Sequence, residues 1–151
     1  MMKNYIFKKA SDMSHYQAEA FTVRCVDDRF WKVFKEFLKS KNYPHIDPKS
    51  PAGGLKVFSS PEFETDREFF VREIEKSIKL HSIRKVMPFS HTDCGVYGGL
   101  AKFGGDKDIE FAFHLEEHKK ARAYLAEKFP VVFLIETYFI DENGIVETTT
   151  M

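Results

Sequence analysis

Short β-prone runs and stretches of helical spacing alternate along the first part of this chain. Residues 19–24 (EAFTVR) are typical of a strand, and apolar side chains recur at helical spacing from about 29 to 40, which predicts an amphipathic helix. Residues 41–54 (KNYPHIDPKSPAGG) contain three prolines and a glycine pair, so we expect a loop there. Residues 55–58 (LKVF) then predict a short strand.

A second helix and a further strand are expected next. Ser60-Pro61-Glu62 has the order of a helix start: an N-cap residue, a proline at the first helical position and an acidic first turn. Apolar residues along one face extend this helix to about His81. Residues 83–89 (IRKVMPF) predict a strand that leads directly to His91.

The last third of the chain predicts a long charged helix at about 108 to 128 and then a hairpin. Residues 131–140 (VVFLIETYFI) are the most strand-like stretch, and the turn at 141–144 (DENG) leads into a final strand. Because strands alternate with helices, we expect an α/β fold in a single domain over residues 1–151. Its sheet is expected to be mainly parallel, with flanking helices and a C-terminal antiparallel hairpin.

Composition and charge narrow the class of protein. Hydrophobic residues make up 43% of the chain and charged residues 30%, which is typical of a globular protein. Lys plus Arg and Asp plus Glu both total 23, so no excess of charge indicates a nucleic acid or a membrane surface as partner. No apolar run is long enough for a signal-peptide core or a spanning helix, and we therefore expect a cytoplasmic location.

Candidate metal ligands follow two of the predicted strands. The only cysteines are Cys25 and Cys94, and a cytoplasmic setting disfavours a disulfide between them. Cys25 ends the first predicted strand, and His91 and Cys94 follow the strand at 83–89. Because ligands gather at the carboxyl ends of parallel strands, we expect these three side chains to meet there. Two thiolates and one imidazole suit Zn²⁺ and leave one tetrahedral position open.

Asp27 and Arg29 lie beside the first of these ligands. An Asp near an open zinc position can accept a hydrogen bond from a zinc-bound water, or it can become the fourth ligand itself. An Arg two residues away decides between the two, because a charge-assisted pair occupies the carboxylate oxygens. Both roles stay open for Asp27 at this point.

Residues 25–29 (CVDDR) and 91–95 (HTDCG) together resemble the paired motifs C-x-D-x-R and H-x-x-C-G of the β-class carbonic anhydrases. The similarity includes the glycine loop at 52–54 (AGG), the apolar strand before His91 and the closing hairpin, so it covers roughly residues 19 to 148. The resemblance implies a short, divergent member of this family, with the family's α/β fold, a zinc ion and dimers or higher homo-oligomers.

The activity that the resemblance implies is a zinc-dependent lyase that interconverts CO₂ and bicarbonate, a carbonate dehydratase. Cys25, His91 and Cys94 would hold the zinc, and Asp27, oriented by Arg29, would align the attacking water on the CO₂ carbon. Backbone amides of the glycine loops would stabilise the developing bicarbonate.

Two other functions remain open at this stage. A non-catalytic zinc-binding relative would have Asp27 permanently in the fourth position. A hydrolase of a CO₂-like sulfur compound would use the same zinc-activated water, since pocket shape rather than the ligands sets that choice. A thiol-redox function is disfavoured because the chain has no C-x-x-C motif.

Other chemically suggestive residues receive simpler interpretations. His114 and His118 match the zinc-peptidase pattern H-x-x-E-H, but little chain remains downstream for a further ligand, so we expect a solvated helix face. Asp28 and Asp93 are expected to be solvated or to cap helix starts. The histidines at positions 15, 45 and 81 (His15, His45 and His81) have no evident chemical context. Gly98 and Gly99 are equally consistent with a turn and with the backbone of a substrate loop.

Overall fold

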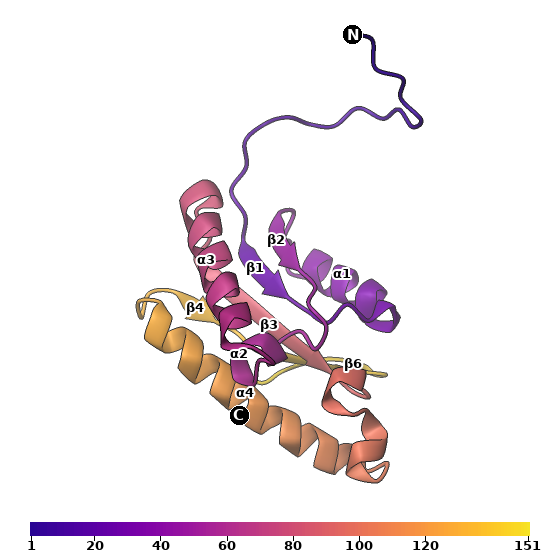
Figure 1. The fold of residues 1–151 in the computed structure, drawn as a ribbon, viewed down its shortest axis with the longest axis vertical. Coiled ribbons are helices and arrows are strands. Elements are labelled where there is room, and N and C mark those ends of the chain that lie inside the picture. Colours follow the sequence, from indigo (N-terminus) through magenta and orange to yellow (C-terminus); the bar gives the residue numbers. More distant parts are fainter.

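A six-stranded sheet forms the centre of the computed structural model, which describes residues 1–151 (Figure 1). The strand order is β2-β1-β3-β5-β6, with β4 also paired to β3. All pairings are parallel except that of β5 with β6, which form the C-terminal hairpin. The strands are β1 (Ala20–Val23), β2 (Ile46–Lys49), β3 (Lys85–His91), β4 (Leu134–Ile135), β5 (Tyr138–Asp141) and β6 (Gly144–Glu147). The predicted fold class is confirmed.

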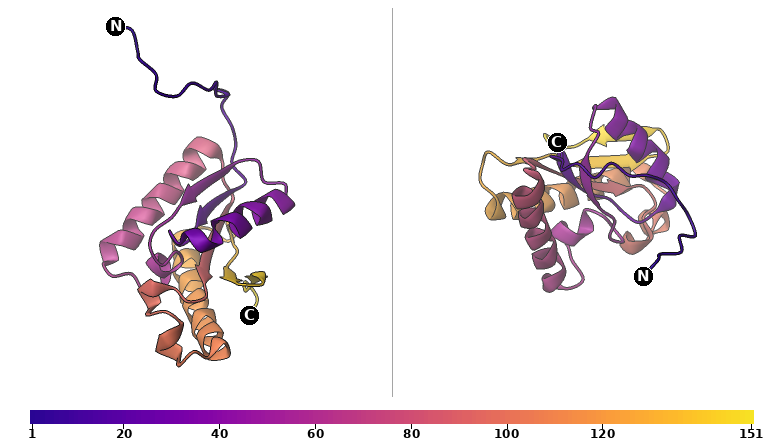
Figure 2. Two further views of the ribbon diagram at one scale, coloured as in Figure 1. Left: turned by 90° about the vertical axis from the view of Figure 1, so that its right-hand side faces the viewer. Right: turned by 90° about the horizontal axis from the view of Figure 1, so that it is seen from above.

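Helices cover both faces of this sheet. One face is covered by α1, and the other by α2, α3 and α4, as the views in Figures 1 and 2 show. The long helices are α1 (Trp31–Ser40), α3 (Glu64–His81) and α4 (Lys107–Lys128). Shorter ones are α2 (Lys56–Ser59) and the 3₁₀ helices η1 (Asp28–Phe30), η2 (Gly95–Tyr97) and η3 (Leu100–Phe103).

Alternation along the buried strands divides the core in two. Val86 of β3 packs towards α3 and α4, whereas Met87 and Phe89 of the same strand pack against α1. Both sets are fully buried, as expected for strands with helices on both faces. The carboxyl ends of β1 and β3 lie side by side, because the two strands are parallel neighbours and Val23 is paired with Pro88.

Two of the predicted elements near the middle of the chain are wrong. Residues 55–58, predicted as a strand, are instead the N-cap Leu55 and the first three residues of the short helix α2. Leu55 follows a glycine pair, and its amide donates to the carbonyl of Phe89 at 2.8 Å. The predicted loop at 41–54 contains β2. Its Pro48 is tolerated because β2 is an edge strand that pairs only with β1.

Two boundaries also differ from the prediction. The helix expected to have Ser60 as its N-cap begins at Glu64, and the Ser60 hydroxyl instead donates to Glu117 at 2.6 Å. The strand expected over 131–140 is divided into β4 and β5, and Val131 is fully exposed before it. Ser60 has a tertiary partner and Val131 has no packing partner, and the local sequence pattern reveals neither fact.

The N-terminal segment extends away from the rest of the molecule in Figure 1, and residues 1–17 are exposed. Near the end of this segment the ring of Tyr16 stacks on those of His45 and His81, with centroid distances of 4.8 and 4.2 Å. His81 also pairs with Asp47 through Nδ1 at 2.7 Å, so these two histidines do have a structural context. None of the helices has the length and apolar character needed to cross a membrane.

Candidate metal centre

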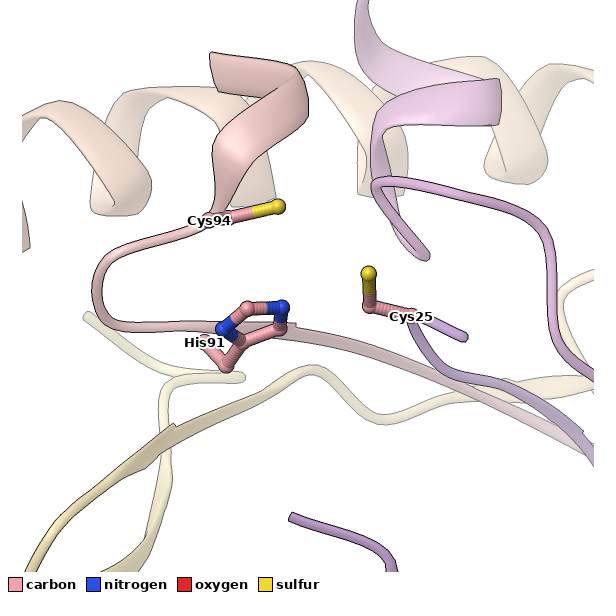
Figure 3. Close-up of side chains that lie close together, drawn as sticks. All are labelled: Cys25, His91 and Cys94. Atoms are coloured by element: carbon pink, nitrogen blue, oxygen red, sulfur yellow. The ribbon is translucent and has the colours of Figure 1, made fainter. Parts of the chain in front are cut away.

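Cys25, His91 and Cys94 meet at the carboxyl edge of the sheet (Figure 3). Cys25 follows the end of β1, His91 is the last residue of β3, and Cys94 precedes η2. Their ligand atoms all lie within 4.8 Å of one another, and all three residues are buried. Both cysteines are free thiols. The three side chains are therefore placed to bind a metal ion.

A glycine pair brings a loop against Cys25. The backbone amide of Gly53 donates to Cys25 Sγ at 3.3 Å. Gly54 has a φ of +54°, and a Cβ there would lie 2.4 Å from the carbonyl oxygen of Phe89 and 2.7 Å from the amide of Cys25. Only glycine fits at this position, so part of the AGG loop is required for the close approach that supports the thiol.

His91 is oriented for metal binding. Its Nδ1 donates to the carbonyl of Thr92 at 2.7 Å, which leaves Nε2 with its lone pair free. This Nε2 is buried and has no hydrogen-bond partner. A buried polar atom without a partner is costly, and a backbone carbonyl that accepts from the other ring nitrogen is the usual arrangement in a metal-bound histidine. The donor set and this orphaned nitrogen both fit a metal ion.

The two cysteines influence each other's protonation. The pKa of Cys25 is lowered, first by its interaction with Cys94, which outweighs desolvation, and then by His91 and the nearby backbone amides. The pKa of Cys94 is raised by the neighbouring Cys25 and by burial. The site thus favours a thiolate at Cys25, the form of cysteine that binds metals.

Asp27 and Arg29 form a bidentate pair next to the three ligands. Arg29 Nη2 lies 2.7 Å from Asp27 Oδ2, and Nε lies 3.1 Å from both carboxylate oxygens. These hydrogen bonds hold the pKa of Asp27 at about 2. Asp27 Oδ2 lies 3.8 Å from His91 Nε2, so the carboxylate borders the metal position and is held by the guanidinium.

Asp93 contributes more than the sequence indicated. Its Oδ1 accepts from the amide of Leu100, the first residue of η3, at 2.8 Å. Its Oδ2 and its carbonyl oxygen each also accept from Arg29 at 3.1 Å. Asp28 is exposed, as expected of a solvated residue. The position of Asp93 between two candidate metal ligands was the available signal for the missed contact with Arg29.

The expectation of a solvated face at His114 and His118 is wrong. Both residues are completely buried, because this face of α4 packs on the sheet. His118 bonds to the hydroxyls of Ser90 and Thr148, each at 2.6 Å. His114 has no partner for either nitrogen. The ring centroids of the two histidines are 6.4 Å apart and both His118 nitrogens are engaged, so the H-x-x-E-H residues do not form a metal site.

These buried histidines should make the protein sensitive to acid. Burial lowers the pKa of His114 to about 4 and that of His118 to about 3, whereas the unfolded value is ~6.5. The unfolded state therefore binds more protons below pH ~6.5, and the free energy of unfolding should fall as pH drops towards 4. Between pH 7 and 4.5, the free energy of unfolding of His114→Leu should fall by about 2 kcal/mol less than that of the wild type. Urea titrations of metal-free protein measure this difference.

His15, which is exposed, provides the control for this measurement. His15→Leu should show the same acid sensitivity as the wild type. An identical loss of stability in His114→Leu and wild type would contradict the assignment of a neutral buried imidazole at position 114.

Removing one thiol should remove the metal. Zinc-loaded wild type should carry about one ion per chain, and Cys94→Ser should retain only a small fraction, because a serine hydroxyl stays protonated at neutral pH. His114→Leu should keep its zinc. Metal analysis after gel filtration measures both, and full occupancy in Cys94→Ser would show that the ligands lie elsewhere.

The fold occurs in solved structures of known proteins. A β-carbonic anhydrase from Trichomonas vaginalis is 14% identical, with a TM-score of 0.57 over 94% of this chain and 88% of that one. A carbonic anhydrase from Streptococcus mutans is also 14% identical, with a TM-score of 0.56 over 93% and 87%. A carbon disulfide hydrolase in its apo form is 13% identical, with a TM-score of 0.52 over 91% and 81%.

No protein-family model and no curated protein sequence matches the chain. The likeness to the solved structures shows that this protein has the fold of the β-carbonic anhydrases, and the resemblance inferred from residues 25–29 and 91–95 is confirmed at the level of fold.

Proposed function

We propose that the protein is a zinc-dependent lyase of the β-carbonic anhydrase family, which interconverts CO₂ and bicarbonate. The observation that carries the proposal is the position of Asp27. Its carboxylate borders a three-ligand site, 3.8 Å from His91 Nε2, and is held by Arg29. A carboxylate held in this way leaves the fourth position to water and substrate, as hydration of CO₂ requires.

Zinc held by Cys25, His91 and Cys94 would lower the pKa of a bound water from ~15.7 towards neutrality and so supply the nucleophile. Asp27 would orient that nucleophile. Its pKa is about 2, so at neutral pH the carboxylate is ionised and accepts hydrogen bonds but donates none. It can therefore accept a hydrogen bond from the attacking water and direct the oxygen at the CO₂ carbon. Arg29 fixes the carboxylate through three side-chain contacts, which limits its freedom to turn away.

The surroundings of the site suit a small uncharged substrate. Tyr97 packs against the two cysteines in a buried apolar cluster. The ring of Phe30 lies 4.7 Å from that of His91. Apolar walls on two sides impose little desolvation cost on CO₂, which has no charge to desolvate.

A second candidate is hydrolysis of carbon disulfide or a similar CO₂-like sulfur compound. It is favoured by one specific observation, the similar fold of a carbon disulfide hydrolase. Asp27 and Arg29 would have the same roles in this reaction. The third candidate, a non-catalytic zinc-binding relative, requires Asp27 to leave Arg29 and occupy the fourth position.

Stopped-flow measurements on one zinc-loaded sample separate the three candidates. Its zinc content is measured first, CO₂ hydration is followed with a pH indicator, and sulfide release from carbon disulfide is followed in a parallel assay. Hydration above the buffer rate supports the lyase, whereas sulfide release without hydration supports the hydrolase. A zinc-loaded protein inactive in both assays would leave the non-catalytic relative.

We also propose a homo-oligomer, as the family resemblance implies. The apolar side chains of the exposed N-terminal segment are consistent with this proposal: Tyr5, Ile6, Phe7 and Met13. Light scattering on the eluting protein measures the assembly. The cytoplasmic location stays a prediction from the sequence.

A further inference from the structure

We propose that Glu110 of α4 is a positioning residue for the metal centre. It holds the turn between His91 and Cys94, that turn holds Arg29, and Arg29 keeps Asp27 from closing the site. The inference rests on the proposed metal site and adds to it a residue outside both sequence motifs.

Glu110 is a buried carboxylate with both oxygens directed at one turn. It is 1% exposed. Its Oε2 accepts from the Thr92 hydroxyl and its Oε1 from the amide of Asp93, each at 2.6 Å. Thr92 and Asp93 are the two residues between the proposed ligands His91 and Cys94. One side chain of α4 therefore anchors both residues of this turn.

The turn has a conformation that benefits from an anchor. Asp93 has a φ of +53°, in the left-handed region that residues other than glycine seldom adopt. The bond from its amide to Glu110 stabilises this conformation. In it, the carbonyl and the carboxylate of Asp93 both face Arg29 and accept from Nη2 and Nη1, each at 3.1 Å.

Arg29 is thus held on two sides. Asp93 receives hydrogen bonds from one edge of the guanidinium and Asp27 from the other. The Arg29 side chain is 54% exposed, so packing alone does not restrain it. If the turn relaxes, Arg29 loses its second support, and the Asp27 carboxylate, already 3.8 Å from His91 Nε2, is freer to bind the metal.

Anion binding to the cobalt-substituted protein tests this sequence of contacts. Co²⁺ takes the place of zinc and reports its ligands in the visible spectrum, and azide is the probe, because it binds only where the fourth position is free. Glu110→Gln keeps the size of the side chain but presents an amide group that cannot accept both hydrogen bonds. We expect about tenfold weaker azide binding with cobalt content unchanged, in line with the loss of one charge-assisted hydrogen bond.

Matched variants distinguish positioning from general damage. Glu116→Gln, on the same helix and exposed, should bind azide like the wild type. Thr92→Val removes the other hydrogen bond to Glu110 without a change in size and should weaken azide binding by about a few-fold. It tests the same anchor if Glu110→Gln does not fold.

The Asp27→Asn background provides the sharpest comparison, because it lacks the carboxylate that would close the site. If Glu110 acts by keeping Asp27 from the metal, adding Glu110→Gln to Asp27→Asn should cause no further loss of azide affinity. Equal weakening in both backgrounds, or wild-type affinity in both Glu110→Gln and Thr92→Val, would overturn the proposal while leaving the metal site intact. A wild type that binds no cobalt would overturn the metal site as well.

Discussion

Asp27→Asn should keep about one zinc per chain and lower the rate of CO₂ hydration by about 10²-fold or more. The substitution leaves the size of the side chain nearly unchanged. It removes the charge that Arg29 pairs with, and it replaces one acceptor oxygen with a donor. The amide would no longer orient the attacking water reliably, while the three proposed metal ligands are untouched. Stopped-flow hydration and metal analysis on the same sample measure the two effects.

Asp28→Asn is the matched control for this variant. Asp28 is the adjacent residue, it carries the same charge, and it is exposed. Its substitution should change neither zinc content nor rate. Turnover like that of the wild type in Asp27→Asn would show that Asp27 has no part in catalysis, and another group would have to orient the water.

Residues that act locally, or at strand ends, were predictable from the sequence. Cys25, His91 and Cys94 could be placed together because parallel strands bring their carboxyl ends to one edge, and the structure has them there. The Asp27–Arg29 pair was predictable from its spacing of two residues. In both cases the inference needs only chain direction and short-range geometry.

Residues whose role depends on packing between distant elements were not predictable. The charged pattern of α4 indicated solvent exposure, yet Glu110, Glu117 and His118 are buried, each with hydrogen-bond partners from other elements. A hydrophobicity pattern predicts solvent exposure for every polar residue, including one that is buried and hydrogen-bonded. For this reason the residues of the candidate site could be predicted from the sequence, but the buried polar residues that contact it could not.

The strand predicted at 55–58 shows the same limit for secondary structure. Leu55, Val57 and Phe58 are apolar and buried, and three such positions among four could not decide between a strand and a helix. The decision depends on Gly54, whose close approach to Phe89 starts the helical turn.

Arg29→Ala should abolish hydration at every pH from 6.5 to 9 while retaining zinc. Arg29 donates three side-chain hydrogen bonds to the Asp27 carboxylate, and its backbone amide donates a fourth to Oδ1 at 3.0 Å. Arg29→Ala keeps only the backbone bond, so Oδ2 is free to take the fourth metal position and exclude water. Arg29→Lys should recover only part of the rate, because an ammonium group cannot make the bidentate contact. Arg72→Ala, at an exposed arginine of α3, should be fully active.

The pH profile of the wild-type hydration rate distinguishes titration of the Asp27–Arg29 pair from titration of another group. The pKa of Asp27 is held at about 2, below its ordinary value of ~3.9, so the stabilisation from its pair with Arg29 is present above pH ~4 and is lost only in stronger acid. Neither member of the pair changes charge between pH 6.5 and 9. The wild-type rate should nevertheless rise from near pH 7 to above pH 8, as expected if zinc held by Cys25, His91 and Cys94 would supply a water that ionises in this range. A flat, inactive profile for zinc-loaded wild type would refute the lyase. A rising profile in Arg29→Ala would show instead that Asp27 does not close the site.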